Sequence, residues 1–204
     1  MTPDNKFIEV IFERLSKNIS FPYYQAERRI DIFINIFLNE IIQQHTPFKN
    51  AEFILPEFPL KHDDTGHSVR VDYLMFDPIK QIVLFIELKT DDHSYGEDQI
   101  LKYEADICFK NWFDKMSKIK MKGFADKKAT LTETIKEKIF KYNDNPQIQV
   151  VILKPTIDES GLLDKRQQGN RHYISLKNIT IDTPYKEEWS LFKQMILDKL
   201  ITKK

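Results

Sequence analysis

The fold of this chain is decided by the stretch Val71-Asp72-Tyr73-Leu74-Met75-Phe76, a turn at Asp77-Pro78, and Ile82-Val83-Leu84-Phe85-Ile86-Glu87-Leu88-Lys89. Both runs are rich in apolar, β-branched and aromatic residues, which is typical of strands. An Asp-Pro pair favours a turn, so the two strands are predicted to form a hairpin. The second run ends in a glutamate and a lysine, which are unusual residues on an otherwise apolar strand.

The charged residues of this hairpin are predicted to converge on one site. Side chains alternate along a strand, so Glu87 and Lys89 project from the same face. Burying a carboxylate and an ammonium group is costly unless something pairs with them. Asp72 and Glu87 offer the hard oxygen ligands that Mg²⁺ or Mn²⁺ takes, and the backbone carbonyl of Leu88 is a further candidate ligand. Lys89 would orient or deprotonate an attacking water and stabilise charge on a phosphate.

This pattern resembles the PD-(D/E)xK nuclease superfamily, whose signature is an acid on one strand and acid-x-lysine on the next. The matching residues are Asp72, Glu87 and Lys89, while Val71 stands in the place of the leading proline. Downstream, Gln99-Ile100-Leu101-Lys102-Tyr103 fits the Gln-x-x-x-Tyr motif of the RecB-like branch. The resemblance covers roughly residues 20–155.

The resemblance implies a fold, a reaction and a cofactor. The fold would be α/β with a restriction-endonuclease-like core, in which a mixed central sheet of about five strands is flanked by helices. The activity would be Mg²⁺- or Mn²⁺-dependent hydrolysis of phosphodiester bonds in DNA, leaving a 5′-phosphate, although the sequence does not separate DNA from RNA. Many small nucleases of this kind dimerise to cut both strands, so the resemblance also admits a homodimer.

The resemblance also assigns roles to three residues outside the hairpin. Gln99 and Tyr103 lie four apart and share one helix face, which in the superfamily looks onto the active site. Gln99 would hold a metal-bound water or the nucleic-acid backbone, and Tyr103 would pack against Lys89 or bind phosphate. RecB-like members often place a glutamate from the first core helix near the metal, which adds Glu27 to the expected metal ligands.

Each of these candidates has a structural alternative. Glu87 and Lys89 would also suit an exposed cross-strand pair at the edge of a sheet, which contributes little stability. Gln99 and Tyr103 would suit a surface glutamine and a half-buried core tyrosine. Glu27 would suit the start of a helix, where a carboxylate meets the positive end of the helix dipole.

A few other polar residues are candidates for the same site. Glu57 on the first strand is a further ligand candidate, and Glu40 is a less favoured one. The loop histidines His62, His67 and His93 follow no zinc-binding spacing, and of these only His93 is a site candidate.

The composition predicts one domain spanning residues 1–204. The chain has 41% hydrophobic and 30% charged residues, as globular proteins do. No run approaches the ~20 apolar residues of a membrane span, and the N-terminus has no signal-peptide pattern. We therefore expect a cytoplasmic protein without a membrane partner. The single cysteine, Cys108, excludes a disulfide framework, a cysteine zinc site and a four-cysteine iron–sulfur cluster.

Charge is distributed unevenly although the formal net charge is zero. Residues 51–101 carry four Lys or Arg against eleven Asp or Glu, a balance of −7. Residues 102–141 carry eleven Lys against six Asp or Glu, a balance of +5. An acidic segment that can bind a metal thus precedes a basic, helical segment that can bind phosphates. The alternative is that these lysines lie on solvated helix faces.

Periodicity and turn residues predict the remaining elements. Helices are expected at 4–17, 23–44, 97–120, 128–142 and 186–202, and further strands at 53–60, 147–153 and 173–181. Thr130 or Thr132 is expected to cap the fourth helix. Pro56 and Pro59 predict an edge or bulged first strand. A core of about 20–155 is thus followed by a C-terminal strand and helix within 170–204.

Two other function classes compete with a nuclease. A zero net charge and the lack of a base-reading motif favour a catalytically silent nuclease-fold module for nucleic-acid binding or protein assembly. The last helix would also suit a protein-interaction surface through its apolar residues, although their helical spacing fits a helix that covers the sheet better. Those residues are Trp189, Phe192, Met195, Ile196 and Leu200.

Overall fold

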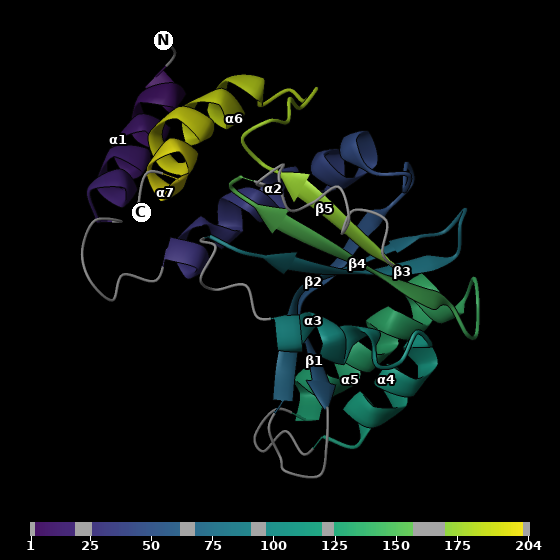
Figure 1. The fold of residues 1–204 in the computed structure, drawn as a ribbon. Coiled ribbons are helices and arrows are strands. Elements are labelled where there is room, and N and C mark those ends of the chain that lie inside the picture. The colour runs from purple at the N-terminus through teal and green to yellow at the C-terminus, as the bar shows by residue number, and fades with distance from the viewer. Residues whose placement is uncertain are drawn as a thin grey trace.

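The computed structural model describes residues 3–18, 26–61, 68–90, 97–119, 125–156 and 170–201, which form an α/β fold around a five-stranded mixed sheet (Figure 1). The strands are Glu52–Lys61 (β1), Ser68–Asp77 (β2), Ile82–Leu88 (β3), Gln147–Lys154 (β4) and Arg171–Ser175 (β5). The α-helices are Pro3–Asn18 (α1), Ala26–His45 (α2), Glu97–Glu104 (α3), Phe109–Ser117 (α4), Ala125–Ile135 (α5), Lys186–Phe192 (α6) and Asp198–Ile201 (α7). Two π-helical segments continue α5 and α6, at Lys136–Phe140 (η1) and Lys193–Leu197 (η2). The predicted fold class is confirmed.

The sheet follows the order of the chain, β1-β2-β3-β4-β5. The first three strands pair antiparallel, and β3, β4 and β5 pair parallel. The predicted hairpin is present, with Tyr73 opposite Ile86 and Asp77 opposite Ile82. Strand β3 lies in the middle of the sheet and is buried from Val83 onward. A strand covered on both faces needs a continuous apolar run, which is what its sequence provides.

The two prolines of β1 fall on an edge strand, as predicted. A register shift between Phe53 and Leu55 bends the strand, and Glu57 has a positive φ of 49°. Proline cannot donate to a ladder, so it is tolerated where one side of the strand has no partner strand.

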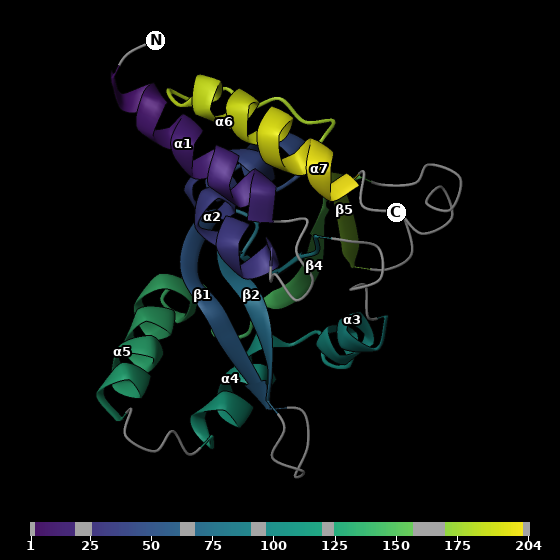
Figure 2. The ribbon, with the colours of Figure 1, turned by 90° about the vertical axis from the view of Figure 1, so that its left-hand side faces the viewer.

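Helices cover both faces of the sheet (Figures 1 and 2). On β2, Tyr73 and Met75 pack with α1, α2, α6 and η2, whereas Leu74 and Phe76 pack with α3, α4, α5 and η1. The Asp72 carboxylate lies near α3, because its charge is among the causes that raise the pKa of Tyr103 on that helix. The last helix contributes Trp189, Phe192, Ile196 and Leu200 to the other face, so it covers the sheet as its spacing indicates.

The prediction of one helix over 97–120 is wrong, because the chain forms two helices separated by a tether to β4. Cys108 makes a single bridge with Gln147, and the N–H of Ile148 donates to the carbonyl of Ile107 at 2.9 Å. The Asp106 carboxylate accepts from the Cys108 N–H at 3.0 Å, and the next helix begins at Phe109. Trp112 and Phe113 are buried after this break.

Two other boundaries also differ from the prediction. The fourth predicted helix begins at Ala125, so neither Thr130 nor Thr132 caps it, and their hydroxyls donate to carbonyls four residues earlier. Strand β5 ends at Ser175 rather than at 181, because a turn follows at 176–178. Among the described residues, none of the helices combines the length and apolar character that crossing a bilayer requires.

His172 introduces a pH dependence into the stability of the sheet. Its half-buried ring places Nε2 2.6 Å from Gln149 Oε1 and meets the Phe48 ring edge-on. Burial lowers the pKa of His172 below its ordinary 6.5, because the charged ring is poorly solvated there. As the pH falls, the unfolded chain therefore takes up the proton before the folded protein does. The contribution of the neutral His172 ring to folding stability is complete above pH 6.5 and is lost as the pH falls toward the folded-state pKa.

We expect His172→Gln to flatten this part of the pH dependence. Urea unfolding of wild type and variant between about pH 5 and pH 8, where histidine titrates, would measure it. An identical slope in the two proteins would contradict the prediction.

Candidate active site

The candidate site begins where β2 and β3 separate. Their ladder runs only as far as Tyr73 opposite Ile86, one residue short of Asp72. Beyond it, the backbone N–H of Leu88 donates to Asp72 Oδ2 at 2.7 Å. The N–H and C=O of one strand residue point to the same side of the strand. The Leu88 carbonyl is therefore turned toward the same half-buried carboxylate.

Glu87 and Lys89 form a buried ion pair at the end of the central strand. Their exposed fractions are 2% and 5%, and Lys89 Nζ lies 2.6 Å from Glu87 Oε1. The Lys89 backbone is held to β4 by a 2.8 Å bond from its N–H to the Leu153 carbonyl. The alternative of an exposed pair on an edge strand is therefore wrong.

Helix α3 adds Gln99 and Tyr103 to this pair. The Tyr103 hydroxyl lies 2.6 Å from Glu87 Oε2 and 2.9 Å from the Arg70 carbonyl, and it accepts from the Gln99 amide. Gln99 Oε1 lies 3.3 Å from Lys89 Nζ. Tyr103 is fully buried, so the alternative of a surface glutamine and a half-buried tyrosine is also wrong. The helix face predicted to look onto the hairpin does so.

Tyr103 acts in this network as a neutral hydroxyl. Its pKa is raised well above 10, first by burial and then by the charge of Glu87 and the hydrogen bond to it, against the opposing bond from Gln99. A tyrosine that stays protonated at every physiological pH can donate its single proton and cannot serve as a base. Glu87 and the Arg70 carbonyl both lie within reach of this one proton, so the hydroxyl links α3 to β3 and β2.

Glu27 lies in the first turn of α2, and its side chain is outside the described part of the structure. The Tyr73 hydroxyl bonds to Asp31, at 3.2 Å from the Asp31 carbonyl, one helical turn after Glu27. The start of α2 therefore lies beside the β2 residue that follows Asp72. The role of Glu27 as a metal ligand stays a prediction.

The remaining acidic candidates take other positions. Glu57 forms an exposed 2.9 Å ion pair with Arg70 across β1 and β2. Glu40 lies nine residues after Asp31 on α2, about two and a half helical turns along the helix. The predictions made for His62, His67 and His93 concern residues outside the described ranges.

Asp72, Glu87 and the Leu88 carbonyl fit a Mg²⁺ or Mn²⁺ ion in their chemistry. Mg²⁺ is commonly bound by one or two carboxylates, with water and phosphate oxygens completing its shell. Within the described ranges, no cluster of three or more His, Cys, Asp and Glu side chains is arranged to hold a metal. Each Glu87 oxygen contacts one protein group, Lys89 or Tyr103. A carboxylate oxygen has two lone pairs, so each of them could also bind a cation.

A second ion pair, absent from the sequence predictions, fixes α3 in place. Arg171 on β5 meets Glu104, the residue after Tyr103, through two parallel N–H···O contacts from Nε and a terminal nitrogen. The side chains are 12% and 22% exposed. Bidentate arginine–carboxylate pairs are strong and directional. No local pattern could have indicated this contact, because 67 residues separate its partners.

Removing the Glu104 carboxylate is expected to destabilise the protein. We expect Glu104→Gln to lower the free energy of unfolding by about 1–3 kcal/mol, less than for a fully buried pair because of the remaining exposure. Glu57→Gln breaks the exposed pair with Arg70 and should change the free energy of unfolding by less than about 1 kcal/mol. Urea denaturation of the two variants gives the comparison. Equal losses would show that burial does not distinguish the two pairs.

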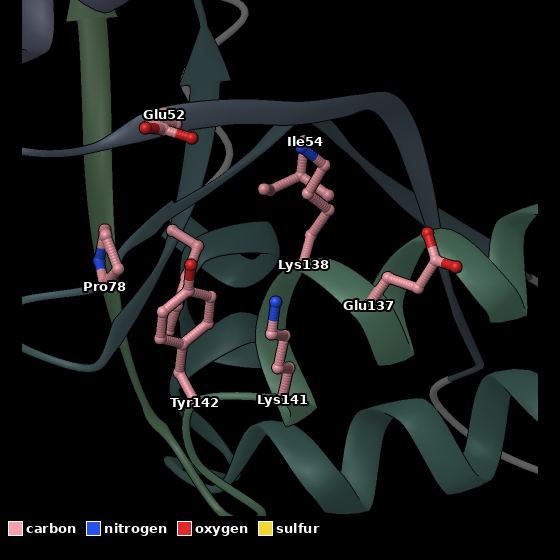
Figure 3. A pocket seen from close by; sticks show the side chains of 8 residues that line it. Glu52, Ile54, Pro78, Glu137, Lys138, Lys141 and Tyr142 are labelled. Atoms are coloured by element: carbon pink, nitrogen blue, oxygen red, sulfur yellow. The ribbon is translucent and has the colours of Figure 1, made fainter.

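An open cavity lies on the same face but at the other end of β2 (Figure 3). Its volume is about 360 Å³, and its wall includes Phe76 and the charged residues Glu52, Glu137, Lys138 and Lys141. Phe76 lies four residues from Asp72, or about 13 Å along a strand. Two acidic and two basic side chains line this cavity, and none of the predicted site residues lines it.

Comparison of the chain with family models, with curated proteins and with solved structures finds no match in any of the three.

Proposed function

We propose that this protein is a metal-dependent nuclease that hydrolyses phosphodiester bonds in DNA, as its resemblance to the PD-(D/E)xK superfamily implies. The observation that carries the proposal is the buried Glu87–Lys89 pair, with Asp72 beside it at the end of a central strand. Buried ion pairs are a weak source of stability, because desolvation offsets their attraction. Strongly interacting titratable groups at one spot are instead typical of functional sites.

In this proposal the two carboxylates and the Leu88 carbonyl hold the cation. When bound, Mg²⁺ or Mn²⁺ supplies positive charge to the scissile phosphate and acidifies water. The Lys89 ammonium orients the attacking water and stabilises charge on the phosphate oxygens. Gln99 Oε1 is close enough to accept a hydrogen bond from that ammonium, and Tyr103 orients one Glu87 oxygen.

The basic segment supports a polyanionic substrate. Residues 102–141, which include α4, α5 and η1, carry eleven lysines against six acids, although the whole chain is neutral. Lysines facing phosphates release counterions and supply most non-specific affinity for DNA. A 5′-phosphate product, a cytoplasmic location and a homodimer belong to the same proposal.

One observation favours the alternative of a catalytically silent module. Glu87 already contacts Lys89 through one oxygen and Tyr103 through the other. A network satisfied by protein groups can persist without a cation. The two functions differ in one measurable property, since a silent module takes up no Mn²⁺ through its carboxylates.

Asp72→Asn tests the proposal through metal binding and hydrolysis together. Wild type is expected to cut supercoiled, linear duplex or single-stranded DNA with Mg²⁺ or Mn²⁺ and to stop in EDTA. Because Asp72 is a proposed direct ligand, its loss should weaken Mn²⁺ binding in calorimetry by more than the about 10- to 100-fold typical of outer-shell partners. Cleavage should fall in parallel.

The matched control is Asp114→Asn, an exposed aspartate on α4 that should leave both measurements unchanged. Carboxylate-independent Mn²⁺ uptake, or full hydrolysis by Asp72→Asn, would reject the proposed site.

A further inference from the structure

A row of lysines lies along one edge of the sheet. Strands β3, β4 and β5 are parallel, so their carboxyl ends meet at the same edge. Lys89 directly follows β3, Lys154 ends β4, and Lys177 comes two residues after β5. Backbone bonds keep these ends in line, from the Lys89 N–H to Leu153 O at 2.8 Å and from the Lys177 N–H to Pro155 O at 3.0 Å.

The register places the first two lysines side by side. Leu88 is level with Leu153, so Lys89 and Lys154, the next residue on each chain, are level too and share a face. Neighbouring strands lie about 4.8 Å apart, which puts the end of β5 about 10 Å from Lys89. The row therefore starts at the candidate active site and leads across the sheet edge.

The row ends at a second cavity, whose walls carry three lysines and one aspartate. This cavity has a volume of about 370 Å³ and lies between the segment after β5 and the helix α6–η2. Its basic residues are Lys177, Lys186 and Lys193, and its acid is Asp198. Lys177 thus belongs both to the lysine row and to the cavity wall.

Hydrogen-bond donors exceed acceptors in this wall. Lys193 Nζ is anchored by a 2.9 Å bond to the Ile179 carbonyl, which leaves two further N–H groups of its ammonium. Trp189 also lines the cavity, and its indole N–H is the one buried side-chain polar group without a hydrogen-bond partner among the residues described. A positively charged, donor-rich cavity suits a ligand with several anionic oxygens, as a phosphate has.

We propose that this cavity binds a phosphate of a nucleic-acid backbone, and that the substrate strand runs along the lysine row from Lys89 past Lys154 to Lys177. This inference rests on the proposed function, which supplies the nucleic acid. Phosphates recur along a nucleic-acid strand, and the lysines recur along this edge of the sheet. One polyanion can therefore contact both the candidate active site and the cavity. An acidic protein segment and an anionic membrane are the competing ligands.

Oligonucleotide binding in EDTA tests the inference without hydrolysis. The variant is Lys177→Gln/Lys186→Gln, and the control is Lys49→Gln/Lys80→Gln, which removes the same charge from exposed lysines just before β1 and in the turn between β2 and β3. Fluorescence anisotropy of a labelled single-stranded oligothymidylate should show at least about tenfold weaker binding for the first variant only. The slope of the logarithm of the binding constant against the logarithm of the salt concentration should become shallower by about 1.4. This value corresponds to two lost phosphate contacts at about 0.7 each.

The outcomes separate this inference from the proposed function. Equal affinity, or an equal loss in both double variants, overturns the inference, while cleavage by wild type would leave the nuclease intact. Cavity-dependent binding with no metal-dependent cleavage rejects the nuclease and supports a binding site alone. Cavity-dependent binding to phosphatidylserine vesicles or to polyglutamate, without binding to the oligonucleotide, would overturn the nucleic-acid assignment.

Discussion

Lys89→Met is expected to abolish metal-dependent DNA hydrolysis, with a rate lowered by about 10²- to 10⁴-fold per folded molecule. The Lys89 ammonium is buried beside Glu87, within reach of Gln99, and no described lysine shares these contacts. Methionine keeps most of the side-chain volume but can neither orient water nor stabilise charge on a phosphate. Initial cleavage rates at saturating Mg²⁺, normalised to the folded fraction from circular dichroism, would measure the loss.

Two further variants make this result interpretable. Lys80→Met replaces an exposed lysine in the turn of the same hairpin and should retain full activity. Lys89→Arg keeps the charge and should retain more activity than Lys89→Met. Hydrolysis by Lys89→Met at the wild-type rate would remove this residue from the proposed mechanism.

Glu87→Ala is expected to destabilise the fold strongly, independently of any activity. The change leaves the Lys89 ammonium, 5% exposed, without its counterion, and it removes an acceptor from the buried Tyr103 hydroxyl. Breaking a buried pair by deleting one partner costs about 3–5 kcal/mol. Urea denaturation without divalent cations would measure the change in the free energy of unfolding.

The matched comparison removes both charges. Glu87→Leu/Lys89→Met fills similar volume with apolar groups and should be far less destabilising than Glu87→Ala, because no unpaired charge stays buried. The single variants Glu87→Leu and Lys89→Met complete a double-mutant cycle, which isolates the coupling between the two side chains. A loss below about 1 kcal/mol for Glu87→Ala would show that Lys89 reaches solvent at little cost.

Divalent cations provide an independent check on the same variants. A ligand that binds only the folded state raises stability in proportion to the logarithm of its concentration. Mn²⁺ should therefore raise the melting temperature of wild type and should leave that of Glu87→Ala unchanged. This response depends on metal binding and not on the reaction.

Local patterns predicted much of the fold. The hairpin is encoded by two apolar runs and an Asp-Pro turn, and the long helix α2 by its apolar stripe. These signals operate over a few residues, so they do not depend on the rest of the chain. They also placed Gln99 and Tyr103 on one helix face, because residues four apart are neighbours on any helix.

The wrong boundaries lie where distant segments override local preference. The helix over 97–120 is broken because Cys108 is bridged to Gln147, which lies 39 residues later. Strand β5 is short because the chain turns at 176–178 to reach α6. Neither interruption has a local signal, since each depends on where another element lies in space.

The sequence by itself determined the fold class and the residues that make the candidate site, because side-chain alternation and helical spacing follow from local backbone geometry. Tertiary structure decided how deeply those residues are buried and which distant residues they contact. It buried Glu87 and Lys89 together, turned Tyr103 onto the second Glu87 oxygen, and brought Arg171 to Glu104. Burial and long-range pairing depend on how the sheet and its helices pack, and no spacing within a single element specifies that packing.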